Sequence, residues 1–171
     1  MAIETFAEMN CSIGRTMSFL GERWTPLVLR ELFFGNRRFE SIQAELGVAS
    51  NVLSARLGTL VEEGIVERNR YSERPERFEY RLTEKGLELQ PIMMAVQTWG
   101  DRHTAPKGAP LDLVHLDCGH VAHAVSTCDH CGGELHARNV RAQAGPGADK
   151  HQRERSALRD AELGRKAAAT K

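Results

Sequence analysis

Three of the four cysteines lie close together late in the chain, and several histidines accompany them. Cys128 and Cys131 have the C-x2-C-G spacing of a metal-binding knuckle, in which the glycine that follows permits a tight turn. Ten residues earlier, a third cysteine begins the sequence C-G-H. Zinc favours four nitrogen or sulfur ligands in a tetrahedron, and this segment supplies them. The predicted zinc ligands are Cys118, His120, Cys128 and Cys131.

The fourth zinc ligand has alternatives, because the segment holds more histidines than one site needs. These alternatives are His115, which has H-x2-C spacing, His123 and His130. Residues 111–140 contain too few large apolar side chains to stabilise a module of about 30 residues alone. We therefore expect a zinc-ribbon-like module in which structural Zn²⁺ supplies the missing folding free energy. A disulfide is less favoured, because a reducing cytosol keeps thiols free.

No arrangement of residues predicts an enzyme. A zinc hydrolase or deaminase needs a general base beside the metal, and no H-x-E motif accompanies the C-x2-C pair. Asp129 lies between two predicted ligands, but its spacing alone gives it no catalytic task. Serine, histidine and aspartate residues are otherwise scattered, without a turn that would present a nucleophile. We expect a closed, structural metal site.

The first half of the chain has apolar residues at helical spacing, with glycines as stops. Gly21 divides the first helical stretch, and Thr25, followed by proline, is the expected N-cap of its second helix. Ser50 is the expected N-cap of a further helix that carries a leucine stripe. The expected helices are two within residues 11–35, one at about 40–46 and one at about 50–63.

A charged hairpin is expected after these helices. The two strand-like runs are 65–71 and 77–82, and the second alternates apolar and charged side chains. Thr83 then caps a long helix that reaches about Gly100. Helices followed by a basic hairpin and a helix predict an α+β fold, a winged helix-turn-helix with the small metal module after it.

A recognition helix presents small and polar residues to base edges in the major groove, and wing arginines contact phosphates or the minor groove. Four glutamates near the hairpin offer a plainer alternative, in which the arginines are neutralised surface charges; they are Glu67, Glu73, Glu76 and Glu79. The predicted DNA-binding residues are Arg37, Arg38, Ser50, Asn51, Ser54, Ala55, Arg56, Arg68, Arg70, Arg74 and Arg77.

Short motifs within residues 11–100 resemble those of a known family. They are C-S-I-G-R-T from Cys11, G-E-R-W-T from Gly21, L-R-E-L from Leu29, V-L-S-A-R-L from Val52 and Y-R-L-T from Tyr80. In order and spacing they resemble the HxlR-type winged-helix regulators, relatives of the MarR group. The resemblance implies a homodimeric transcription factor on a roughly palindromic operator, with dimerisation through segments near 4–20 and 84–100. It leaves open whether this member is a repressor or an activator, and which effector it answers.

The fourth cysteine, Cys11, matches a position at which certain members of that family carry a redox-sensing thiol. Arg15 lies one helical turn onward and would favour a thiolate. Ser12 departs from the family pattern, in which proline is common at that position. The alternative role for Cys11 is that of a small buried apolar residue.

Charge is distributed unevenly, although the whole chain has a formal net charge of +0. The predicted winged-helix domain, 1–102, carries −2, residues 103–140, which include the metal module, carry −2, and the tail 141–171 carries +4. We expect the tail to be flexible or at most transiently helical, and we see no internal repeat. A cytoplasmic, DNA-binding regulator without a membrane span is expected. The alternative is a zinc-ribbon interaction module whose winged helix binds protein.

Overall fold

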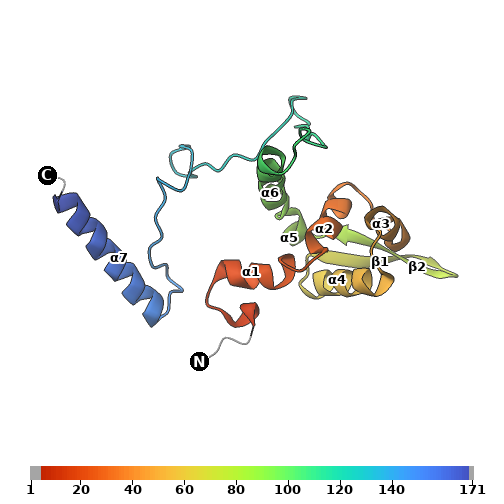
Figure 1. The fold of residues 1–171 in the computed structure, drawn as a ribbon. Coiled ribbons are helices and arrows are strands. Elements are labelled where there is room, and N and C mark those ends of the chain that lie inside the picture. Colours follow the sequence, from red (N-terminus) through yellow and green to blue (C-terminus); the bar gives the residue numbers. More distant parts are fainter. Residues whose placement is uncertain (1–4, 170–171) are drawn as a thin grey trace.

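The computed structural model describes the backbone of residues 5–169 and the side chains of residues 5–162. The first residues of the predicted domain, including the start of the expected dimerisation segment 4–20, and the last two of the tail lie outside this range. The helices before the hairpin are η1 (Phe6–Glu8), α1 (Ser12–Leu20), α2 (Thr25–Phe33), α3 (Phe39–Leu46) and α4 (Ser50–Glu62). Their order is the predicted helix-turn-helix order (Figure 1).

One apolar core holds these helices together. Leu53, Leu57 and Leu60 of α4 are at most 1% exposed, as the stripe at helical spacing predicts. They pack with the buried Leu29 of α2 and Ile42 of α3. Since α4 is fixed along its whole buried face, its opposite face is held in a defined orientation toward solvent.

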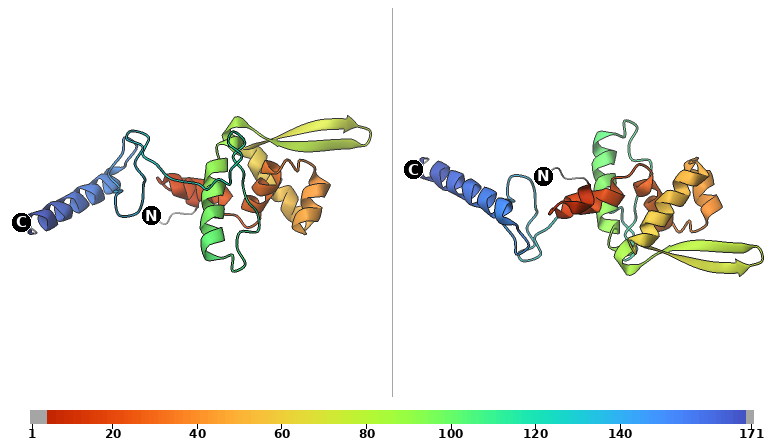
Figure 2. Two further views of the ribbon diagram at one scale, coloured as in Figure 1. Left: turned by 90° about the horizontal axis from the view of Figure 1, so that it is seen from above. Right: turned by 90° about the horizontal axis from the view of Figure 1, so that it is seen from below.

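The hairpin is a two-stranded antiparallel sheet of β1 (Val66–Glu73) and β2 (Glu76–Leu82). Val66 pairs with Leu82 at its base, and the register shifts between Arg70 and Ser72 near its tip. The buried side chains of Ile65 and Val66 tie the base to the core. The outer part of the hairpin projects beyond the helices as a wing (Figure 2).

The long helix expected after Thr83 is two helices, α5 (Glu84–Leu87) and α6 (Gln90–His103). Thr83 caps α5 as predicted, because its side chain accepts a hydrogen bond from the Gly86 amide. Pro91, in the first turn of α6, has no N–H to continue the helical ladder, which accounts for the interruption.

Two predicted N-caps are wrong by one residue. Ala49, not Ser50, is the N-cap of α4, and no side-chain hydrogen bond caps that end. Trp24, in the left-handed region at φ 82°, precedes α2, so Thr25 is the first helical residue. Ser50 is thereby left with an exposed side chain at the start of α4.

Beyond α6 the chain runs through an extended Cys/His segment, residues 111–140, to α7 (Lys150–Ala169). The composition of the tail predicts flexibility, whereas the structure has a 20-residue helix in it, rich in alanine, arginine and other good helix formers. Figures 1 and 2 place α7 beyond α1 and far from the wing. None of the helices within residues 5–169 is long and apolar enough to cross a membrane.

Candidate nucleic-acid interface

The outward face of α4 is small and polar at its N-terminal end. Ser50, Asn51, Ser54 and Ala55 are all exposed, while the leucine stripe on the opposite face is buried. Short side chains permit close backbone approach to base edges, and an asparagine amide can bond to adenine in two places. Four of the predicted DNA-binding residues therefore lie together on one accessible surface.

The wing brings basic side chains beside this surface. Arg68 and Arg77 line a hollow of about 260 Å³ together with Ser54 of α4 and the carboxylates of Glu40 and Glu76. The guanidinium of Arg68 lies over the ring of Phe78, 3.5 Å from its centroid, and this stacking fixes its direction. Helix and wing thus form one continuous polar surface of the kind that contacts a groove and its flanking phosphates.

The wing arginines differ in how free they are. Arg70 is paired with Glu73 at 3.6 Å and with Glu76 at 3.4 Å, so the plainer alternative of neutralised charge applies to it. Arg74 is exposed at the tip. Among the described side chains, no ion pair is found for Arg68, Arg74 or Arg77, which leaves these guanidinium groups available to phosphates.

The remaining predicted arginines divide between the surface and the interior. Arg37 and Arg38 are exposed next to the hairpin, where Arg38 stacks over the ring of Tyr71 at 5.1 Å. Arg56 instead is half-buried and bonded to Glu22 Oε2 at 3.0 Å. Within the described residues its Nε is buried without a hydrogen-bond partner. The structure therefore separates Arg56 from the exposed set and ties it to the α1–α2 turn.

Comparisons with known proteins agree with this arrangement. Residues 19–108 match the model of the HxlR-like helix-turn-helix family. The chain belongs to this family. An HTH-type transcriptional regulator of Mycobacterium tuberculosis (strain ATCC 25618 / H37Rv) is 47% identical over 137 residues, covering 80% of this chain and 87% of the relative. The protein is therefore a DNA-binding transcriptional regulator, and its relatives are regulators rather than enzymes.

Two solved structures add to the comparison. The transcription factor PA1607 is 33% identical with a TM-score of 0.73, covering 81% of this chain and 98% of that one. The redox regulator HypR, in its reduced form, is 26% identical with a TM-score of 0.50, over 54% of this chain and 92% of its own.

Cys11 occupies the N-cap of α1. Its sulfur accepts a hydrogen bond from the Gly14 amide at 3.5 Å, and the side chain is half-buried. Arg15, expected to favour a thiolate, donates from Nε to the Met9 carbonyl at 2.9 Å. The tail also reaches this place, because Gln152 accepts a hydrogen bond from the Asn10 side chain at 2.9 Å. This long-range contact had no signal in the sequence.

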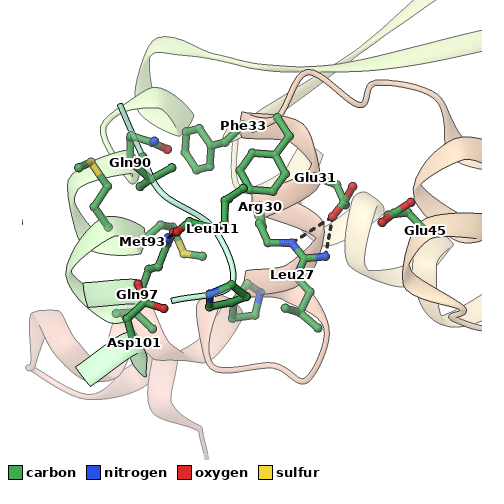
Figure 3. Close-up of a pocket in the computed structure, with 16 residues that line it drawn as sticks. Leu27, Arg30, Glu31, Phe33, Glu45, Gln90, Met93, Gln97, Asp101 and Leu111 are labelled. Atoms are coloured by element: carbon green, nitrogen blue, oxygen red, sulfur yellow. Dashed lines mark hydrogen bonds and ion pairs between the residues drawn. The ribbon is translucent and has the colours of Figure 1, made fainter. Parts of the chain in front are cut away.

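A mainly apolar cavity of about 480 Å³ lies between α2 and α6 (Figure 3). Leu27 and Phe33 line it from α2, Met93 lines it from α6, and Leu111 closes one side. Arg30 lies at its wall, where the carboxylate of Glu31 holds it at 2.7 Å. Its volume and lining suit a small apolar ligand.

The four predicted zinc ligands do not form one cluster in this structure, although the side chains of Cys128 and Cys131 are in hydrogen-bond contact. Among the side chains of residues 5–162, no three of Cys, His, Asp or Glu are close enough together to hold a metal ion. All four cysteines are free thiols. Backbone hydrogen bonds from Cys131 and His130 lower the pKa of the Cys128 thiol, and a side-chain hydrogen bond with Cys131 adds to this. The zinc site remains a prediction.

Proposed function

We propose that this regulator binds operator DNA sequence-specifically as a homodimer, with α4 in the major groove and the wing on the flanking backbone. The observation that carries the proposal is the joint surface of α4 and the wing. Ser54 shares one hollow with Arg68 and Arg77, so a base-reading helix and phosphate-binding arms face the same side. Wing arginines supply the positive charge, because the domain as a whole is close to neutral.

The dimer is supported by apolar side chains left open to solvent on the terminal helices. Ile13 of α1 is 73% exposed, and Val96 and Trp99 of α6 are 60% and 62% exposed. Phe6 of η1 is 62% exposed. In a monomer these four apolar side chains stay in contact with water, which is unfavourable. A second copy of the chain would cover them and gain the free energy of their burial. Two-fold symmetry would then set two α4 helices on a roughly palindromic site.

The test begins with selection of bound fragments from genomic DNA by the purified full chain. We expect an enriched motif with two related half-sites, whose spacing follows from the dimer. Asn51→Ala should cost about 1–3 kcal/mol at each of the two half-sites and relax the preference at one base pair of each. Lys107→Ala, at an exposed lysine away from α4 and the wing, is the matched control and should change neither.

Enrichment without a motif, or a motif without symmetry, would contradict this proposal. Salt-insensitive capture of a protein partner by the same surface would instead support the alternative, in which the winged helix binds protein.

A redox response is a second candidate, favoured by the half-buried Cys11 at the N-cap of α1 and by the likeness to HypR. We propose that oxidation of this thiol by peroxide, which yields a sulfenic acid, weakens operator binding. Operator affinity should fall in the native chain on peroxide treatment and remain unchanged in Cys11→Ser. An equal response in the two proteins would remove Cys11 from this role.

A further inference from the structure

The Cys/His segment contains two turns with the same backbone hydrogen bonds, 13 residues apart. In the first turn, the Gly119 amide donates to the His115 carbonyl, and the His115 amide donates to the His120 carbonyl, each at 2.8 Å. In the second turn, the Gly132 amide donates to the Cys128 carbonyl, and the Cys128 amide to the Gly133 carbonyl, again at 2.8 Å each. The backbone hydrogen bonds therefore form an internal repeat, although the residue types of the two turns differ.

The repeat continues on both sides of each turn. A β-bridge joins Val114 and Val121 around the first, and one joins Thr127 and Glu134 around the second. The glycine after each second ligand position has a left-handed backbone, with φ +72° at Gly119 and +71° at Gly132. Because a residue with a Cβ is strained at that φ, the glycine fixes the turn in this shape.

The repeat assigns equivalent positions to the side chains. His115 corresponds to Cys128, and Cys118 corresponds to Cys131. His120 corresponds to Gly133, which has no side chain and therefore no ligand in the second turn. The Nδ1 atom of His115 lies 3.3 Å from the sulfur of Cys118, so these two donor atoms already face each other.

We propose that the two turns together form a Zn²⁺ site whose four ligands are His115, Cys118, Cys128 and Cys131. Each turn supplies two ligands, and the C-x2-C and H-x2-C spacings are those of structural tetrahedral sites. The metal would bring the two turns together, because binding of structural zinc supplies folding free energy in small modules of this kind. His115 thereby replaces His120 as the fourth ligand.

Asp117 supports this choice of histidine. Its Oδ2 lies 3.6 Å from Nε2 of His115, on the side of the ring opposite the Nδ1 that faces Cys118. A metal-bound histidine commonly donates its other N–H to a carboxylate, which fixes the ring and raises its basicity.

The site would also hold the segment against the winged helix. The Gln97 side chain donates to the Leu111 carbonyl at 3.1 Å, and the Ala124 amide donates to the Thr98 hydroxyl at 3.3 Å, so the first turn is anchored to α6 at two points. Leu111 is also one wall of the cavity in Figure 3. Closing the metal site would therefore fix the second turn near α6 and reduce the freedom of that cavity wall.

The experiment compares the native full chain with three histidine variants, each purified under reducing conditions and stripped of metal. Zn²⁺ affinity is measured by competition with a chromophoric chelator, and Co²⁺ is used as a spectroscopic probe of ligand number and type. We expect one Zn²⁺ per chain and a tetrahedral Co²⁺ spectrum with thiolate charge-transfer bands. This test does not involve DNA, so it is independent of the proposed function.

His115→Ala should weaken Zn²⁺ binding by more than about 100-fold, because loss of an outer-shell partner alone typically costs about 10–100-fold. His120→Ala is the matched control and should leave the affinity within a few-fold of native. His115→Cys should keep tight binding and strengthen the thiolate bands, which separates loss of a ligand from misfolding.

Three results would overturn the assignment. The first is an His120→Ala variant that loses binding while His115→Ala retains it. The second is one Zn²⁺ for every two chains, which would place the four ligands on two copies. The third is the absence of Zn²⁺ binding in the reduced native chain.

Discussion

The winged helix and the Cys/His segment are ordered in different ways. In the first, leucine, isoleucine and valine side chains from four helices and the hairpin base are almost fully removed from water. In residues 111–140 no side chain is buried, and order comes from backbone hydrogen bonds within two turns. One region derives its stability from apolar burial, while the other would derive it from the Zn²⁺ proposed above. The two should therefore respond independently to perturbation.

Removal of zinc is the perturbation with the largest expected effect. Binding of a structural Zn²⁺ contributes about 10–16 kcal/mol in comparable modules near pH 7, and a chelator withdraws that contribution. We expect hydrogen exchange to show loss of protection at the Gly119 and Gly132 amides, with the amides of α4 unchanged. Equal loss in α4 would mean that the two regions fold as one unit.

Truncation of a core side chain should have the next largest effect. It should destabilise the winged helix and leave the Cys/His segment unchanged. Leu57→Ala removes a side chain that is 1% exposed and should cost about 2–5 kcal/mol in urea unfolding. Ser54→Ala, on the exposed face of the same helix, should stay within about 0.5 kcal/mol. Zinc affinity should be equal in the two variants. A lower affinity in Leu57→Ala would mean that the stability of the winged helix and zinc binding by the Cys/His segment are coupled.

The wing provides a smaller effect that is confined to binding. Arg74→Ala should reduce the slope of log affinity against log salt by about 0.9 for each phosphate that is no longer neutralised, or about 2 when this happens at both wings of a dimer. Arg70→Ala is the matched comparison and should reduce it less, because Glu73 and Glu76 already occupy that guanidinium. Equal slopes in the two variants would show that the ion pairs of Arg70 do not reduce its contact with DNA phosphates. Titrations of operator DNA across salt concentrations measure this.

The tail should give the smallest effect. A chain ending at residue 140 lacks a segment of net charge +4 and its hydrogen bond with Asn10, but retains the recognition surface. We expect the same operator preference and a salt slope lower by less than the Arg74→Ala change. An identical salt slope in the full chain and the shortened chain would show that the tail does not contribute to DNA binding.

The winged helix was largely predictable because its pattern is local. The leucine stripe at residues 53, 57 and 60 fixes one face of α4, and alternation marks the second strand of the wing. Pro91 signalled the break before α6, but the apolar periodicity across it favoured one long helix. The caps at Thr25 and Ser50 each differ by one residue, since side-chain preference does not decide where the first helical hydrogen bond forms.

The contacts that the sequence did not reveal are those between distant or dissimilar residues. Nothing local couples Arg56 to Glu22, or Asn10 to Gln152, and both pairs depend on how packed elements meet. The two turns of the Cys/His segment share only a C-G pair in sequence, because histidine in one replaces cysteine in the other. Only their hydrogen bonds reveal the equivalence of His115 and Cys128.

The ion pairs of Arg70 have a consequence for how such a protein finds its site. If the wing contacts DNA as proposed, a phosphate on random DNA has to displace Glu73 and Glu76 from this guanidinium, so we expect the two carboxylates to act as tethered competitors of the DNA backbone. We then expect shorter dwell times on non-operator sequence and an earlier return to free diffusion. A paired arginine in the wing thus favours a rapid genomic search over prolonged sliding.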